Sequence, residues 1–334
     1  MKSNIAKVNV SCYVCNSTDQ KVIARGREHE YTTTTDDLFS VVKCAKCGLL
    51  FLNPRPAESE LGTIYPNEYP AFVEEQIPAH QSALSKLKDS FIDKLGYPSR
   101  VRTALQYVSA RKAPLRILDV GCGAGRVLSL FKQFYDGPIE TVGLDFDEKA
   151  TALTQGKGHD VITGTFETVA IPPASFDCVY SSHVIEHVAD PGAFLKKVKS
   201  VLKPGGLFFC ETPNIGSIDA QILSRLGIWG GFHFPRHWSF FTPKTLGHLG
   251  ERAGLKIVAT KFYLIPIFWI WSLHLLMVKV AGRRIADRLF PAVEHGANPL
   301  QLFILTSAFT VVDWLTLLIT RRTACMFVIF RNED

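Results

Sequence analysis

The segment RILDVGCGAGRVLSLF (Arg116–Phe131) constrains the fold of this 334-residue chain more than any other part of its sequence. The apolar block of Ile117, Leu118 and Val120 is too short for a helix and predicts a buried strand. Three glycines at alternate positions follow, and apolar residues then recur at helical spacing from Val127 to Phe131. A strand, a glycine turn and a helix form the first half of a nucleotide-binding unit, in which a ligand approaches the bare backbone at the helix N-terminus.

The spacing of the glycines and a later acid narrow the choice of ligand. A dinucleotide fingerprint needs a third glycine where this chain has Arg126, so the turn is not typical of NAD binding. The next apolar block, TVGLDFD, ends at Asp145, about twenty residues after the turn, where a carboxylate can accept both hydroxyls of a ribose. The alternative role is a helix N-cap before EKATAL, which Asp147 fills equally well.

Four motifs follow one another along the chain, namely LDVGCGAG, GLDFD, GTFETVAIPPASFDCVYSSHVIEHVADP and LKPGGLFFCETPN. With them the chain resembles the class I S-adenosylmethionine-dependent methyltransferases over about residues 115–260, with a final strand near 324–330. The resemblance implies an α/β fold with a Rossmann-like seven-stranded methyltransferase sheet, and S-adenosylmethionine as the cofactor.

The resemblance also implies the residues that bind the cofactor. In the family the glycine turn holds the methionine part, the acid after the second strand holds the ribose, and the next residue lies against the adenine. In the loop GTFE this chain has Thr165 where many relatives have an acid, so the threonine hydroxyl or the backbone around Phe166 would contact the base. The expected cofactor-binding residues are Asp119, Gly121, Gly123, Gly125, Asp145, Phe146, Thr165, Phe166 and Ser181.

Several histidines are candidates for a catalytic base. A sulfonium methyl group is already activated, so catalysis needs in-line placement of the nucleophile and, for a hydroxyl, a base. His183 follows the fourth predicted strand, and His233 and His237 lie in GFHFPRHWSFFT after the fifth. We interpret His187, in EHV, as a structural residue that orients its helix, and Arg236 as a candidate to hold a phosphate or carboxylate.

Two Cys-x-x-Cys knuckles near the N-terminus predict a metal site. We expect Cys12, Cys15, Cys44 and Cys47 to complete a tetrahedron of thiolates around one structural zinc ion. Two disulfides are the alternative, but they need an oxidising compartment. Because the start of the chain is polar and lacks the apolar core of a signal peptide, we expect the chain to begin in the cytosol.

These patterns divide the chain into four parts. Residues 1–56 form a zinc-ribbon-like domain, and residues 57–114 form a linker with lid or packing helices. An amphipathic helix near 84–95 is expected as a lid, a membrane-surface helix or a docked helix, and a second near 101–108 packs on the sheet. Residues 115–263 plus 323–334 form the methyltransferase domain, and residues 264–322 form an apolar helical insertion before the last strand.

The insertion contains two apolar stretches, Leu264–Ala281 and Leu300–Thr320, each near the length that spans a bilayer. Three arginines lie between them at 283–288, and Lys279 and Asp313 lie within them, which argues against spanning. We therefore expect helices that lie in the membrane interface, with tryptophans at headgroup level. The alternative is a helical cap packed on its own sheet or on a second subunit of a homo-oligomer.

Charge helps to choose among functions. The net charge is +6, and residues 256–322 hold eight basic and three acidic residues, a net of +5. The excess therefore lies far from the cysteine knuckles, which argues against nucleic acid as a partner. We expect methyl transfer to a hydroxyl or sugar position of a lipid-linked or apolar acceptor by a cytoplasmic protein, peripheral or monotopic on the inner face of the membrane. The alternatives are a soluble methyltransferase of a nucleotide-sugar or small metabolite, and a non-catalytic binding scaffold, against which the intact glycine turn argues.

Overall fold

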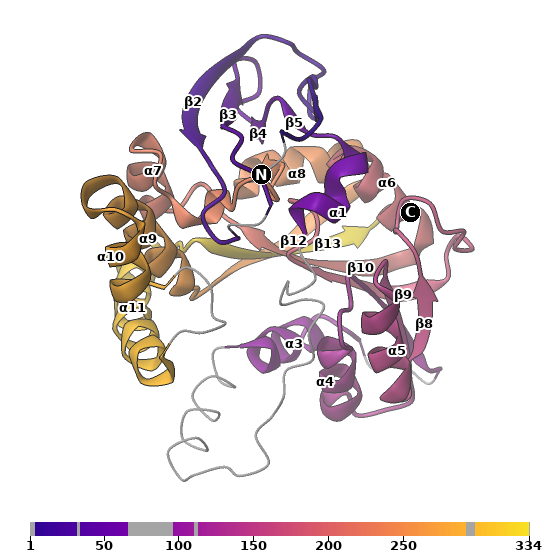
Figure 1. The fold of residues 1–334 in the computed structure, drawn as a ribbon. Coiled ribbons are helices and arrows are strands. Elements are labelled where there is room, and N and C mark those ends of the chain that lie inside the picture. The colour runs from indigo at the N-terminus through magenta and orange to yellow at the C-terminus, as the bar shows by residue number, and fades with distance from the viewer. Residues whose placement is uncertain (1–3, 32–33, 66–95, 110–112, 292–297, 334) are drawn as a thin grey trace.

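A computed structural model describes residues 4–31, 34–65, 96–109, 113–291 and 298–333 (Figure 1). Its centre is a seven-stranded sheet with the strand order β12-β13-β10-β9-β6-β7-β8. The strands are, in chain order, β6 (Leu115–Val120), β7 (Ile139–Asp145), β8 (Asp160–Thr163), β9 (Phe176–Ser182), β10 (Leu202–Pro213), β12 (Leu255–Tyr263) and β13 (Cys325–Asn332). The predicted sheet is confirmed.

The strand directions bring the functional segments to one edge of the sheet. Strands β6 to β10 run parallel to one another, whereas β13 is antiparallel to both β10 and β12. Consequently β12 is parallel to β10, and β13 alone in this sheet is reversed. We call the edge at which Val120, Asp145, Ser182 and Pro213 end their strands the carboxyl edge; open α/β sheets bind ligands there.

Helices cover both faces of the sheet, as its nearly continuous apolar strands require. Helices α3 (Tyr97–Leu105) and α4 (Arg126–Phe134) pack on one face, and α6 (Pro191–Val201) and α8 (Pro243–Arg252) on the other (Figure 1). Successive strand residues alternate between the two cores: Phe208 belongs to the α6 and α8 side, and Phe209 to the α3 side. The second predicted amphipathic helix is α3, whereas the first, near 84–95, lies outside the described residues. The remaining helices of this region are α5 (Glu148–Gly156), α7 (Ile218–Arg225), the short α1 (Leu61–Ile64) and the 3₁₀ turns η1 (Glu58–Glu60) and η3 (Gly230–Phe232).

The N-terminal part, which we call the cysteine unit (residues 4–56), is joined to the main domain by backbone pairing. Its four-stranded sheet has the order β11-β4-β3-β2, from β2 (Gln20–Gly26), β3 (Phe39–Cys44), β4 (Leu50–Leu52) and β11 (Ser239–Phe240), beside a small pair of β1 (Lys7–Val8) and β5 (Arg55–Pro56). The strand β11 comes from the segment that follows β10, nearly two hundred residues later. In addition, the Leu52 N–H donates to the Trp238 carbonyl at 2.9 Å. The sheet of the cysteine unit is thus completed by the main domain.

The insertion leaves the sheet at the carboxyl edge, between the end of β12 and the start of β13. It consists of α9 (Ile267–Ala281), α10 (Arg283–Leu289) and α11 (Pro299–Thr320), which stand together at one side of the sheet (Figure 1). The three arginines between the two apolar stretches lie on the short helix α10. Among the described residues, α11 is the one helix long and apolar enough to cross a membrane, with a mean hydropathy of 2.0.

Candidate active site

The glycine turn at the end of β6 has a backbone that only glycine adopts without strain. The φ angles of Gly121, Gly123 and Gly125 are 75°, 50° and 74°, all in the left-handed region. A Cβ on Gly121 would also lie 2.5 Å from Cγ2 of Val184. The turn leads directly into α4 at Arg126, so that bare backbone and a helix N-terminus face the carboxyl edge.

Asp145 ties this turn to the end of β7. Its Oδ2 accepts the N–H of Gly123 at 3.0 Å, and its Oδ1 accepts the N–H of Asp147 at 3.1 Å. The helix cap that was the alternative role for Asp145 is made by Asp147, whose side chain accepts the N–H of Ala150 at 2.8 Å. Each oxygen of Asp145 retains a lone pair for a ligand hydroxyl, and burial raises the pKa of this carboxyl.

Three polar groups are buried around the turn, and two of them have no hydrogen-bond partner within the described ranges. These two are the hydroxyls of Tyr180 and Ser181, and the third buried group, the carboxyl of Asp119, is 2% exposed. Burial and the neighbouring Asp145 raise the pKa of Asp119 well above its usual value. A buried polar group left unpaired costs about 1–3 kcal/mol, so the site fits a cofactor with polar atoms at this position.

The aromatic residues near the expected adenine position differ sharply in exposure. Phe146, directly after Asp145, is 57% exposed, which is unusual for a phenylalanine. Phe166 is buried and packs edge-on against Phe194 at 5.2 Å, so its ring belongs to the core and only its backbone can reach a ligand. Thr165 is exposed, and its hydroxyl bonds to that of Thr168 at 2.8 Å.

Among the candidate bases, His183 lies at the carboxyl edge and remains accessible. Its Nδ1 is 3.0 Å from Oε1 of Glu186, and its side chain is 31% exposed. Burial alone would lower the pKa of His183, but Glu186 and Glu211 outweigh both burial and Arg100 and raise it. The other oxygen of Glu186 accepts the Thr212 hydroxyl at 2.9 Å. Because Nδ1 donates to the carboxylate, Nε2 is the atom that can accept a proton.

His233 and His237 lie in the protein interior, each 5% exposed. The Nε2 of His233 accepts the N–H of Arg236 Nε at 2.7 Å, and Nδ1 of His237 donates to the Gly231 carbonyl at 2.9 Å. Burial, together with neighbouring cationic and imidazole groups, lowers the pKa of both histidines well below its usual range. Of the three candidates, the geometry therefore favours His183 as the base.

Arg236, expected from the sequence to hold a ligand anion, is completely buried and holds the protein's own carboxylates. It pairs with both oxygens of Glu28, and its Nη2 donates to Oε2 of Glu30 at 3.1 Å. Its Nη1 also donates to the carbonyl of Ile64 at 3.1 Å. Glu28 lies 208 positions from Arg236 in the sequence, and no local pattern could have identified this pair.

The four predicted metal-ligating cysteines come together in the cysteine unit. The sulfurs of Cys12 and Cys47 are 3.3 Å apart, those of Cys15 and Cys44 are 3.5 Å apart, and all four lie within 4.8 Å of one another. These separations exceed the S–S bond of about 2.05 Å in a disulfide. Although burial alone would raise it, the N–H groups of Cys47 and Lys46 lower the pKa of Cys44 to about 7. The cluster fits a tetrahedral metal ion better than disulfides.

The sheet order, the glycine turn at the carboxyl edge and the buried acid at the end of β7 define an enzyme of the Rossmann-like, nucleoside-cofactor class. Comparison with known proteins identifies the family within this class. The profile of a family described as "Methyltransferase domain" matches residues 95–260. The chain belongs to the class I S-adenosylmethionine-dependent methyltransferases.

The sequence relatives agree with this family. The ubiquinone biosynthesis O-methyltransferase of Ruegeria pomeroyi is 35% identical over 178 residues, which cover 48% of this chain and 68% of the relative. The protein of the same name from Cereibacter sphaeroides is 34% identical over 170 residues, with the same coverage. A solved S-adenosylmethionine dependent methyltransferase from Mesorhizobium loti is 18% identical and aligns with a TM-score of 0.45 over 71% of this chain and 100% of that chain; the family assignment rests on the profile and the sequence relatives.

Proposed function

We propose that the protein transfers a methyl group from S-adenosylmethionine to a hydroxyl of an apolar or lipid-linked acceptor at the cytosolic face of a membrane. The names of the sequence relatives support O-methylation. The observation that carries the proposal is the position of the insertion. The insertion, with its two apolar helices α9 and α11, leaves the sheet at the carboxyl edge, so an apolar surface adjoins the edge at which the cofactor binds.

Much of α11 presents apolar side chains to its surroundings. Large exposed apolar patches mark interaction or membrane sites in monomeric proteins. Basic side chains flank this helix, with Arg284 and Arg288 on α10 and Arg321 and Arg322 after its last turn, which suits anionic lipid headgroups. The exposed apolar residues of α11 are Leu300, Phe303, Ile304, Val311, Trp314, Leu315, Leu318 and Ile319.

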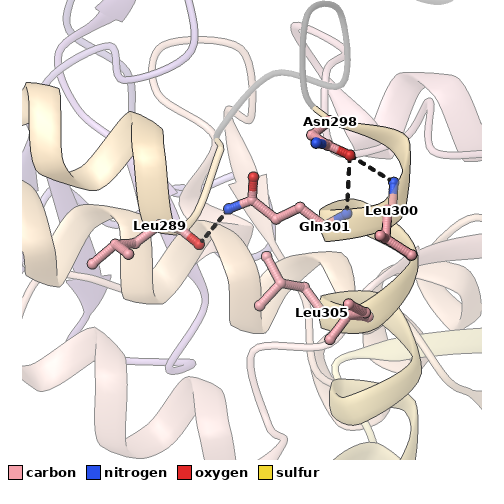
Figure 2. Close-up of a pocket in the computed structure, with 6 residues that line it drawn as sticks. Leu289, Asn298, Leu300, Gln301 and Leu305 are labelled. Carbon is pink, nitrogen blue, oxygen red and sulfur yellow. Dashed lines mark hydrogen bonds between the residues drawn. The ribbon is translucent and has the colours of Figure 1, made fainter.

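An apolar hollow lies between α10 and the start of α11. Figure 2 shows Leu289, Leu300 and Leu305 along its wall, while the Gln301 amide donates to the Leu289 carbonyl at 3.1 Å and joins the two helices. The hollow has a volume of about 270 Å³ and an almost wholly apolar lining. It extends the apolar surface of α11 and supports contact with hydrocarbon.

An interfacial position of the insertion is favoured over a spanning one. Asp313, in the middle of α11, is buried and accepts the N–H of Ile265 at 2.6 Å and the indole N–H of Trp269 at 2.7 Å. These bonds fix α11 to the start of α9, which at 15 residues is too short to span a bilayer. Of the tryptophans expected at headgroup level, Trp314 is exposed, whereas Trp269 is held by Asp313 and Trp271 packs on His233.

The chemistry follows from the residues at the carboxyl edge. When bound, S-adenosylmethionine supplies a methyl group activated by its sulfonium. Asp145 and the glycine turn would hold its nucleoside and methionine parts, and Asp119 and Ser181 would pair with its polar atoms. His183 would accept the hydroxyl proton at Nε2 as the acceptor oxygen takes the methyl group, and Glu186 would stabilise the resulting imidazolium through Nδ1–H.

The cysteine unit supports a structural metal. We propose that Cys12, Cys15, Cys44 and Cys47 hold one zinc ion, since four thiolate ligands leave no position open for water or substrate. The ion would stabilise a unit too small to build a large core of its own.

Methyl transfer to matched pairs of acceptors tests this function. Each pair consists of an apolar phenol or a polyprenyl-linked sugar and its water-soluble counterpart, with S-adenosylhomocysteine formation as the readout in the presence of anionic liposomes. We expect the apolar member to be preferred and His183→Gln to abolish turnover without loss of cofactor binding. Preference for the soluble member would favour the methyltransferase of a nucleotide-sugar or small metabolite instead.

A further inference from the structure

We propose that Arg236 is a positioning residue through which the cysteine unit holds the pair His183 and Glu186 in its working geometry; this inference rests on the proposed function. It assigns a catalytic purpose to a unit that lies outside the residues shared with the methyltransferase family. Arg236 connects the cysteine unit to this pair in two ways. Its guanidinium group contacts the cysteine unit, and the backbone from Arg236 onward contacts the segment that carries Glu186.

The guanidinium half is anchored in the cysteine unit. Arg236 is completely buried, and Glu28 and Glu30 reach it from the segment that follows β2. The ring of Tyr31 also lies 4.9 Å from the guanidinium carbon. A bidentate Arg–carboxylate pair fixes orientation as well as distance, so the position of Arg236 depends on how this segment is folded.

The backbone half reaches the catalytic pair. The Arg236 carbonyl lies 3.0 Å from Nδ1 of His187, the residue after Glu186. Two and three residues after Arg236, the backbone N–H groups of Trp238 and Ser239 both donate to the carbonyl of Glu186, at 2.7 and 3.1 Å. The segment from Arg236 to Ser239 therefore fixes the backbone of Glu186, whose carboxylate is the partner of His183.

The same short segment is also a strand of the cysteine unit. Ser239 begins β11, which pairs with β4 and so with the sheet that leads into the Cys44 and Cys47 knuckle. Backbone pairing on one side and the buried ion cluster on the other leave the segment little freedom. Loosening the cysteine unit should therefore displace Glu186 while the glycine turn and Asp145, on other strands, keep their shape.

The position of Arg236 should depend on the charge of Glu28. Burial alone would raise the pKa of Glu28, but Arg236 outweighs it and lowers the pKa, whereas burial raises the pKa of Glu30. Glu28 is therefore the charged partner that balances the buried guanidinium. Removing the charge of Glu28 leaves the buried positive charge of Arg236 without a full counter-charge. Glu28→Gln therefore hardly changes the volume of the side chain but should disturb the position of Arg236.

The experiment compares Glu28→Gln with Glu140→Gln in the full chain. Glu140 also pairs with an arginine, Arg116, at 3.5 Å, but it is 56% exposed and lies near the start of β7, away from the carboxyl edge. The pKa of His183 is followed by nitrogen NMR of histidine-labelled protein, with His183→Gln to assign the signal, and S-adenosylmethionine affinity is followed by calorimetry. Neither readout needs the acceptor, so failure of the proposed function and failure of this link can be told apart.

We expect Glu28→Gln to lower the pKa of His183 while cofactor affinity stays within twofold of the parent, and Glu140→Gln to change neither quantity. An unchanged His183 pKa in folded Glu28→Gln protein overturns the link, as does a parallel loss of cofactor affinity. If Glu28→Gln does not fold, Glu28→Asp decides by the same criteria, because it keeps the charge but shortens the side chain that pairs with Arg236 through both oxygens.

Discussion

Nδ1 of His183 lies 3.0 Å from Oε1 of Glu186, and the backbone of His183 adopts a left-handed φ of 54°. A non-glycine residue in this region is strained, and such strain persists where surrounding contacts over-determine it, often at functional sites. Here the His183 N–H donates to the Glu211 carbonyl at 2.9 Å, which holds the turn at the end of β9. The imidazole is thus fixed by a backbone bond and by a buried carboxylate, the arrangement expected of an oriented base.

The first prediction concerns the pH dependence of methyl transfer. A base must be neutral to act, and the pKa of His183 is raised, so activity should fall with decreasing pH from above the usual histidine value near 6.5. Glu186→Gln removes the charge that raises this pKa, which should move the acidic limb to lower pH and reduce the maximal rate by about 10²–10⁴-fold. Rate profiles of the two proteins measure both effects. An acidic limb at the same pH in both would show that Glu186 does not set the pKa of the base.

The second prediction concerns the cofactor. If Asp145 holds the ribose hydroxyls, Asp145→Ala should weaken S-adenosylmethionine binding at least tenfold, because hydrogen bonds to a charged group contribute about 1.5–3 kcal/mol. Asp147→Ala is the control, since Asp147 caps α5 and should affect stability more than affinity. Equal calorimetric affinities for the Asp145 variant and the parent would remove the assignment.

The third prediction concerns the metal. Elemental analysis of protein purified without chelator should find one zinc per chain, and Cys44→Ser should lose it. Because the glycine turn and Asp145 lie in the main domain, the variant should still bind S-adenosylmethionine. Zinc in less than a tenth of chains of the parent protein would contradict a structural site.

The fourth prediction concerns membrane attachment. The protein should sediment with anionic liposomes, and Arg284→Glu with Arg288→Glu should weaken binding by about 1 kcal/mol per residue at moderate salt. Arg283 is left unchanged, because its guanidinium donates to the His29 carbonyl at 3.0 Å and its reversal would disturb the fold. Ile319→Asp, at a side chain 81% exposed, should also reduce sedimentation without lowering the melting temperature. If the full-length protein stays in the supernatant, the insertion does not attach it to membranes and is instead a packing element of a soluble enzyme.

Local features of the chain were predictable from the sequence alone. The strand, glycine turn and helix around Gly121–Gly125 depend on backbone freedom and apolar spacing within sixteen residues. The cap made by Asp147 and the Cys-x-x-Cys knuckles likewise depend on neighbours a few positions apart. The order of the motifs was enough to predict the class of sheet and the edge at which its ligands bind.

Other features were decided by tertiary structure. The sequence does not distinguish His183 from His233 as a base, because burial depends on which distant segments pack over each side chain. The partner of Arg236 was expected to be a ligand and is instead Glu28, from the other end of the chain. Periodicity and turn chemistry act between neighbours in the sequence, whereas burial, ion pairing and the pKa values they set depend on residues that meet only when the chain has folded.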